Sequence, residues 1–151
     1  MKKQQVLDKI NDTWQQLLAS TQGLTAAQMT QPGVTGEWSV KDILAHVTWW
    51  EEECLKYLPL ILQGGRPPRY SVMYGGIDAF NATMTRERQA LSAEEVLRSL
   101  HQTHRTLLAY LAGVPDEAFA SETRFRRRLR NDTFGHYPEH AGAIRAWRAG
   151  I

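Results

Sequence analysis

The chain has 151 residues, of which 42% are hydrophobic and 23% are charged, and this composition fits one globular domain and excludes a disordered chain. A formal net charge of +2 is too small to indicate a nucleic-acid or membrane partner by itself, and no apolar run approaches the roughly 18 residues of a membrane span. The single cysteine, Cys54, cannot form an internal disulfide, and no apolar signal segment follows Met1, so we expect one cytoplasmic domain over residues 1–151.

The first predicted helix has a clear apolar stripe. From Val6 to Leu18, apolar residues recur at steps of three and four, the period of a helix with one buried face. Thr25 and Gln28 then predict a short capped turn, and Pro32, Gly33 and Gly36 predict a loop after it.

The second predicted helix is long and is followed by an unusual connection. Ser39 and Asp42 form a capping box, so this helix is expected over residues 40–63. Residues 64–76 contain four glycines and two prolines. The helix is roughly 36 Å long, and about 12 extended residues reach about 40 Å, so the connection can recross the bundle. We therefore predict an all-α four-helix bundle with up-down-down-up order, in which the second and third helices run parallel.

The third helix is expected from Ile77 to Gly113, with a looser region at residues 91–92 and a second capping box from Ser92 to Glu95. Residues 117–130 are expected to form an irregular, arginine-rich connection. The alternation of Phe125 and Leu129 could make a short strand, but such a strand has no evident partner. A fourth helix, carrying His140 and Ile144 on one face, closes the bundle.

Two histidines of the last segment are candidate metal ligands. His136 and His140 are four residues apart, a spacing at which two imidazoles on one helix can hold the same ion. Pro138 leaves two alternatives. If the helix begins at Pro138, His136 lies outside it and the geometry of the pair is lost. If the helix begins near residues 132–133, Pro138 kinks it while both rings stay roughly aligned.

His46 is the third candidate ligand. It lies at one edge of the apolar stripe of the second helix, so that its ring can face the interior while Asp42 accepts the other ring proton and fixes the tautomer. Trp50 and Tyr137 neighbour the candidate ligands along the chain and are candidates for the wall of an apolar substrate pocket. From the residues alone, an ordinary core or surface role is the commoner explanation of the three histidines, and simple core packing explains Trp50 and Tyr137 equally well.

Two segments carry a resemblance to a known family. Residues 36–51 read GEWSVKDILAHVTWWE and residues 136–147 read HYPEHAGAIRAW. They resemble the second-helix and final-helix motifs of the DinB/YfiT-like superfamily, and particularly of its ClbS/DfsB branch. The resemblance implies a bundle in which His46, His136 and His140 bind a divalent metal ion, nickel or zinc.

The resemblance also implies a class of chemistry. Three imidazoles leave coordination positions open, and a dication there lowers the pKa of bound water or of a bound thiol. We therefore expect a metal-dependent enzyme that acts on a small molecule, in detoxification or resistance for example. It would be either a hydrolase or a transferase that uses a low-molecular-weight thiol, and related bundles pair as homodimers.

The arginines between residues 124 and 130 support an alternative function. Their basic run, interleaved with Phe125 and Leu129, predicts a non-catalytic bundle that sequesters a small molecule or contacts nucleic acid. A solvated segment paired with nearby acids is the commoner arrangement, and nucleic-acid contact is the less favoured function. Capture of an anionic substrate tail is a further alternative, because the segment leads directly to His136.

Overall fold

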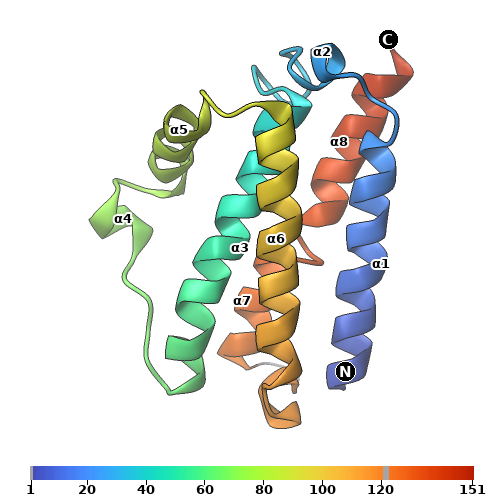
Figure 1. Cartoon of the computed structure of the whole chain (residues 1–151). Coiled ribbons are helices and arrows are strands. Elements are labelled where there is room, and N and C mark those ends of the chain that lie inside the picture. The colour runs from blue at the N-terminus through green and yellow to red at the C-terminus, as the bar shows by residue number, and fades with distance from the viewer. Residues whose placement is uncertain (1, 121–122) are drawn as a thin grey trace.

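The computed structural model of the chain describes residues 2–120 and 123–151 and contains helices and loops (Figure 1). In chain order the elements are α1 (Lys3–Thr21), α2 (Ala26–Met29), α3 (Val40–Leu62), α4 (Tyr70–Met73), α5 (Ile77–Arg88), α6 (Ala93–Ala112), the 3-10 turn η1 (Asp116–Phe119), α7 (Arg124–Asp132) and α8 (Tyr137–Ala149). None of the described helices combines the length and the apolar character that a membrane span requires.

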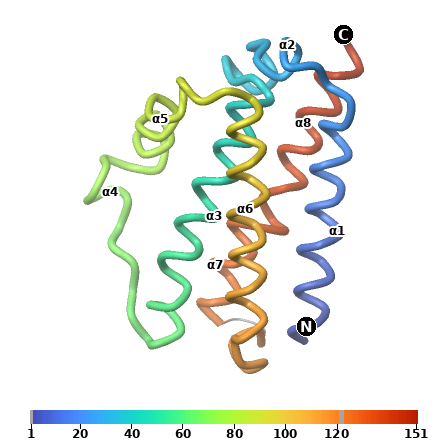
Figure 2. Tube along the Cα trace, in the orientation of Figure 1, coloured from blue at the N-terminus to red at the C-terminus, as the bar shows by residue number. Residues whose placement is uncertain are grey.

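The predicted up-down-down-up order is confirmed. In Figures 1 and 2, α1 runs up from the N-terminus, α3 and α6 both run down, and the chain returns upward through α7 and α8. The segment after α3 climbs back along the bundle before α6 begins. The parallel arrangement of α3 and α6 therefore follows from this long crossover.

The central helix of the bundle is α3, which packs against α5, α6 and α7, while α1 packs mainly against α8. Its start is fixed by the predicted capping box, in which the Ser39 hydroxyl accepts from Asp42 N at 3.1 Å and the Asp42 carboxylate accepts from Ser39 N at 3.0 Å. Nearly every side chain from Val40 to Glu51 is buried, because neighbouring helices cover α3 on several sides. A ring nitrogen on this helix is thus placed inside the protein.

The predicted third helix is two helices, α5 and α6, joined by residues 89–92. Ser92 adopts an extended conformation and caps α6, and the ammonium group of Lys41 donates to the carbonyls of Gln89 and Leu91 at 3.0 and 2.7 Å. These bonds hold the break against the start of α3. Gly76 at the start of α5 has a φ of 121°, a left-handed value that glycine adopts at little cost, and it turns the chain from α4 into α5.

The prediction of an irregular connection at residues 117–130 was wrong, because this segment contains η1 and α7; residues 121–122 lie outside the described part of the chain. Thr123 caps α7, since its hydroxyl accepts from Arg126 N at 3.1 Å. Phe125 and Leu129 are buried on one face. A spacing of four places two side chains on one face of a helix and also on one face of a strand, so the spacing alone did not identify the helix.

Candidate metal centre

His46 enters the centre from the middle of α3 and is only 6% exposed. Its ring packs beside the indoles of Trp38 and Trp49, with centroid separations of 4.8 and 5.1 Å. These large neighbours leave the imidazole little freedom to turn, so that its orientation is set by packing.

His136 reaches the centre from the turn between α7 and α8, and Pro138 lies in the first turn of α8 without kinking it. The first of the two sequence alternatives is therefore close to the structure, but the expected loss of the pair's geometry does not occur. The chain stays coiled between the two helices, as Tyr137 N donates to Thr133 O at 2.9 Å and His136 has φ and ψ of −107° and −47°. His140 follows one turn later on α8.

Three ring nitrogens meet at one point. His136 Nε2 lies 2.9 Å from His46 Nε2 and 2.9 Å from His140 Nε2, and the ligand atoms of all three residues lie within 4.8 Å of one another. Nitrogens bound to one tetrahedral zinc ion at 2.0–2.1 Å are about 3.3 Å apart, so the spacing suits a single ion. The structure thus joins residues that are 90 positions apart in the chain.

The electrostatics of the three-histidine cluster also fit a cation. Burial, followed by the neighbouring histidines, lowers the pKa of His46 to about 2, and burial and His140 lower that of His136 to about 3. Burial also lowers the pKa of His140. Three neutral imidazoles bring their Nε2 atoms together, and two facing lone pairs repel unless a proton or a cation lies between them. The set therefore fits a divalent metal ion that prefers imidazole ligands.

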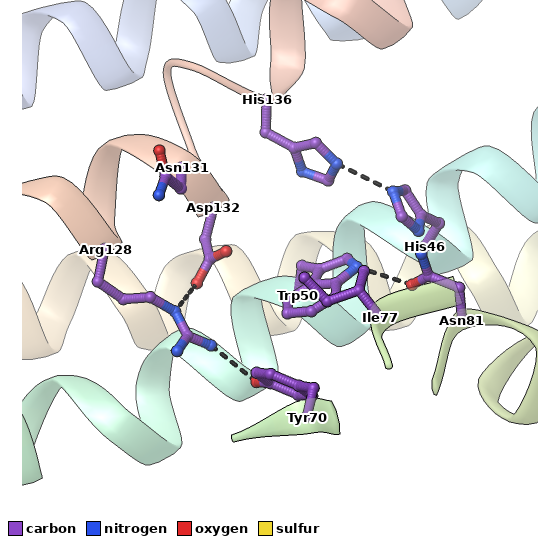
Figure 3. A pocket seen from close by; sticks show the side chains of 9 residues that line it. All are labelled: His46, Trp50, Tyr70, Ile77, Asn81, Arg128, Asn131, Asp132 and His136. Carbon is purple, nitrogen blue, oxygen red and sulfur yellow. Dashed lines mark hydrogen bonds and ion pairs between the residues drawn. The ribbon is translucent and has the colours of Figure 1, made fainter. Parts of the chain in front are cut away.

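Asp42 does not contact His46 in the structure. Its carboxylate accepts hydrogen bonds from the amide and the hydroxyl of Ser39, both at 3.0 Å. The Nδ1 atoms of His46 and His136 are buried and make no hydrogen bond with the described residues. The side chain beside His46 is instead Asn81, and its amide opposes part of the lowering of the His46 pKa that burial causes (Figure 3). Asp42 lies one turn before His46, but its carboxylate is used to cap the start of α3 and so is not the acceptor for the His46 ring.

A cavity of about 350 Å³ adjoins the cluster (Figure 3). Two of the histidines, His46 and His136, form part of its wall, and Trp50 also lines it. The other lining residues are Tyr70, Ile77, Asn81, Arg128, Asn131 and Asp132. The cavity is within the size range of small-molecule sites and combines aromatic walls with a few polar groups.

Comparison with known proteins identifies the family. The family profile described as the DinB superfamily matches residues 9–143, most of the chain. The chain belongs to the DinB superfamily. The resemblance found in the two sequence motifs is thus confirmed. No curated protein sequence matches the chain.

Several solved structures share the DinB fold over nearly the whole chain. The colibactin self-resistance protein ClbS, in complex with double-stranded DNA, has a TM-score of 0.83 at 16% identity and covers 99% of this chain and 97% of its own. The sibling lethal factor precursor DfsB has a TM-score of 0.84 at 15% identity, with 99% and 96% covered. A protein from Streptococcus pneumoniae has 0.81 at 14% identity, with 99% and 91% covered. At these identities the likeness shows the fold alone.

Asn81 and Asp132 of the DinB pocket were missed in the sequence, and Arg128 was considered only as part of the basic run. Asn81 Oδ1 accepts from the indole N–H groups of Trp49 and Trp50 at 3.1 and 2.9 Å, which fixes its amide against α3. Arg128 Nε donates to Asp132 at 2.6 Å. The spacing of this pair, four residues with opposite charges, would have indicated the contact had α7 been predicted as a helix. Asn81 carried no signal, since only the crossover brings α5 to this wall.

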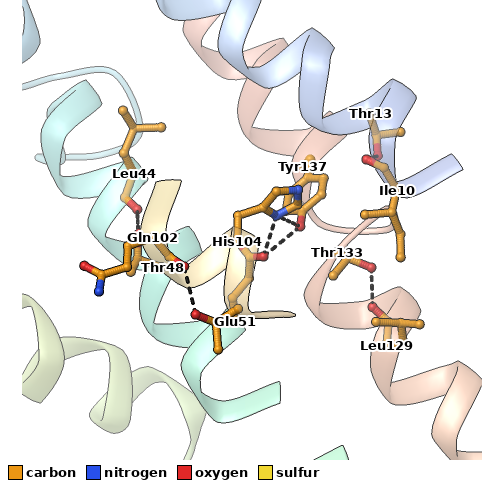
Figure 4. A network of polar contacts seen from close by, with 11 residues as sticks. Ile10, Thr13, Leu44, Thr48, Glu51, Gln102, His104, Leu129, Thr133 and Tyr137 are labelled. Carbon is orange, nitrogen blue, oxygen red and sulfur yellow. Dashed lines mark hydrogen bonds and ion pairs between the residues drawn. The ribbon is translucent and has the colours of Figure 1, made fainter. Parts of the chain in front are cut away.

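Tyr137, the second predicted pocket residue, lies outside this cavity. It is fully buried and donates its hydroxyl to Glu51 Oε1 at 3.2 Å, the same oxygen that accepts from His104 Nδ1 at 2.8 Å (Figure 4). Trp14 stacks on the His104 ring at 3.6 Å. Burial raises the pKa of both Glu51 and Tyr137. In this DinB chain, Tyr137 therefore anchors the start of α8 next to His136.

Proposed function

We propose that the chain is a metal-dependent enzyme of the DinB/ClbS type, in which His46, His136 and His140 hold one nickel or zinc ion. The observation that carries this proposal is the meeting of three buried Nε2 atoms at the wall of a cavity large enough for a small molecule. The substrate would lie in that cavity, beside the ligands from α3 and from the start of α8. Three protein ligands with a neighbouring cavity are the arrangement of catalytic rather than structural zinc sites.

The residues around the cavity suggest a division of roles. A divalent ion held by three imidazoles supplies Lewis acidity, which lowers the pKa of a water molecule or thiol bound beside it. Trp50 offers an apolar face on which a substrate can pack. Asn81, held by two indoles, presents a fixed amide at the cavity wall. Asp132 and Arg128 place a charged pair on the opposite side of the pocket from His46 (Figure 3).

Two reactions fit these roles, and one experiment separates them. A hydrolase needs only water as the second reactant, whereas a transferase needs a low-molecular-weight thiol. Turnover of a panel of activated esters, amides and strained-ring compounds by metal-loaded protein would be measured with and without added thiol. Activity without thiol supports hydrolysis, and activity that depends on thiol supports transfer.

Metal binding tests the proposal directly. Protein purified without a histidine tag and stripped with chelator is titrated with nickel or zinc, and the bound metal is measured by mass spectrometry. We expect about one ion per chain for the wild type and loss of that ion in His140→Ala. The matched control is His101→Ala on α6, because His101 is half-buried and lies outside the cluster. Retained metal in His140→Ala, or no stoichiometric metal in the wild type, would reject the ligand set.

Contact with double-stranded DNA is a second candidate function. It is favoured by one observation, the DNA complex of the structurally similar ClbS. In this chain several of the α7 arginines are engaged within the protein; Arg124, for example, donates to the carbonyl of Gly65 and Arg128 to Asp132. Fluorescence anisotropy with a short duplex at salt concentrations between about 50 and 200 mM would test it, because phosphate contacts weaken steeply over this range. Salt-independent or unsaturable signal would reject DNA contact.

A further inference from the structure

A second cavity, next to the first, is lined mainly by arginines. It has a volume of about 440 Å³ and lies between the crossover and α7. Its lining residues are Ile61, Arg66, Pro67, Arg69, Arg124, Arg127, Arg128 and Asn131. Within the described part of the chain, no acidic residue lines it. We call this cavity the arginine hollow.

The arginine hollow is held together by contacts between two distant segments. Arg124 donates to the carbonyls of Gly65 and Gly64 at 3.0 and 3.3 Å, which fastens the beginning of the crossover to α7. Carbonyl groups accept hydrogen bonds from Arg124, but a carbonyl group is uncharged and does not neutralise the guanidinium. Arg66 and Arg69, both exposed, add two further cations from the crossover. Gathering like charges at one place costs energy unless an anion offsets them, which points to an anionic ligand.

The arginine hollow and the histidine cavity share two wall residues, Arg128 and Asn131. Arg128 is paired with Asp132 and also donates to the Tyr70 hydroxyl at 3.0 Å, so its guanidinium is fixed at the boundary. Its charge is largely offset by Asp132. Arg128 therefore lies between the two cavities, and beyond it no carboxylate of the described residues forms an ion pair with Arg66, Arg69 or Arg124.

We propose that the arginine hollow binds an oxyanion group, carboxylate or phosphate, of a small-molecule substrate whose reacting part lies beside His46 and His136. The inference rests on the proposed function and names its substrate class: an anionic molecule with an apolar body that packs on Trp50. Guanidinium groups bind both kinds of oxyanion through paired hydrogen bonds. Such a molecule would span the boundary that the two cavities share at Arg128 and Asn131.

The shape of the hollow favours a small molecule over nucleic acid. Its volume is within the range of small-ligand pockets, and its arginines surround a concavity instead of following an extended stripe. Duplex binding typically buries a much larger surface and spreads its phosphate contacts along the groove. The positive field of the hollow would also speed the approach of an anionic substrate.

Calorimetric titration tests the anion site with simple probes. Inorganic phosphate, pyrophosphate and succinate are each titrated into the full-length protein, with and without bound metal. In the variant Arg66→Gln/Arg69→Gln, the affinity for whichever probe binds the wild type most tightly should fall at least about tenfold. Arg105→Gln, an exposed arginine on α6 outside the lining of the hollow, is the matched control and should bind as the wild type does. Tighter binding of phosphates or of succinate tells which oxyanion the substrate carries.

The outcomes separate this inference from the proposed function. Both arginine variants should bind metal as the wild type does. A failure of the proposed metal site would therefore appear in the metal titration, and a failure of the anion site would appear in the anion titration. Saturable anion binding that is lost in the double variant supports the hollow. Wild-type protein that binds none of the three probes, or a double variant that binds them unchanged, overturns it. A duplex DNA that binds through Arg66 and Arg69 more tightly than pyrophosphate would also overturn it, in favour of nucleic acid.

Discussion

Two buried histidine clusters lie in the same bundle and are built in opposite ways. His104 pairs with the carboxylate of Glu51, and Tyr137 donates to the same oxygen, so that the cluster contains both donors and an acceptor. In the three-histidine cluster, imidazole nitrogens face one another at 2.9 Å, and no acidic group belongs to the cluster among the described residues. The Nδ1 atoms of His46 and His136 have no partner there either.

The difference teaches how to separate a structural histidine from a metal ligand. His104 Nδ1 has a carboxylate oxygen as its partner inside the protein, although the second oxygen of Glu51 is buried and has no hydrogen-bond partner among the described residues. Buried imidazoles that meet through their lone pairs are left incomplete by the protein and are completed by a cation. Burial alone does not distinguish the clusters, because His46, His140 and His104 are 6%, 6% and 4% exposed.

The largest expected effect lies in the acid-containing cluster. His104→Ala removes the partner of the fully buried Glu51 and the ring stacked on Trp14, and it should lower the free energy of unfolding by about 3–5 kcal/mol. Urea denaturation followed by circular dichroism measures this. His101→Ala on the same helix is the control and should cost less than about 1 kcal/mol. Equal losses in both variants would contradict a structural role specific to His104.

In the three-histidine cluster, a substitution should have a large effect on metal affinity and a small effect on stability. His140→Ala should weaken nickel or zinc binding more than about 100-fold, since even changes behind the ligands cost 10–100-fold. Without metal, the same substitution should cost less stability than His104→Ala, because it relieves the crowding of facing nitrogens. Competition with a chelator measures the metal affinity, and urea denaturation of the metal-free protein measures the free energy of unfolding. If metal-free His140→Ala loses as much stability as His104→Ala, the proposed difference between the two clusters is wrong.

A second buried acid, Asp132, extends the comparison, because its partner is an arginine instead of a histidine. Burial raises the pKa of Asp132 to about 6, although Arg128 and Cys54 act in the opposite direction. A raised carboxyl pKa stabilises the folded state at pH values below the unfolded pKa near 4, and this contribution is lost as the pH rises through about 6. The stability of the wild type relative to Asp132→Asn should therefore fall between pH 4 and pH 7, by on the order of 2 kcal/mol. Urea denaturation over this pH range measures it, and a flat difference would contradict the assignment.

The smallest expected effect concerns the residue that faces His46. Asn81→Ala removes the amide that Trp49 and Trp50 hold in place, and metal affinity should fall about tenfold with the ligands intact. Asp42→Ala is the informative counterpart, since Asp42 caps α3. It should lower stability by about 1 kcal/mol and leave metal affinity unchanged. If Asp42→Ala lowers metal affinity and Asn81→Ala does not, Asp42 is the partner of His46 after all.

Sequence patterns predicted most of the bundle, and their failures have local causes. The capping boxes at Ser39 and Ser92 placed the starts of α3 and α6, because a cap acts within one turn of chain. The segment of α7 was predicted as irregular because its apolar residues, Phe125 and Leu129, are too few to make the period evident. Pro138 was a source of ambiguity because a proline suits the first turn of a helix as well as a kink.

Periodicity, capping signals and the two histidine motifs are local properties, and so the chain itself determined an all-helical bundle, its parallel crossover and the identity of the three candidate ligands. Tertiary packing decided which polar groups meet. In the folded protein Asp42 caps α3 and Tyr137 donates to Glu51. Asn81 and the crossover arginines line the two cavities. The physical reason is that side-chain partners depend on how helices distant in sequence are rotated and placed against one another, and no local pattern specifies that rotation.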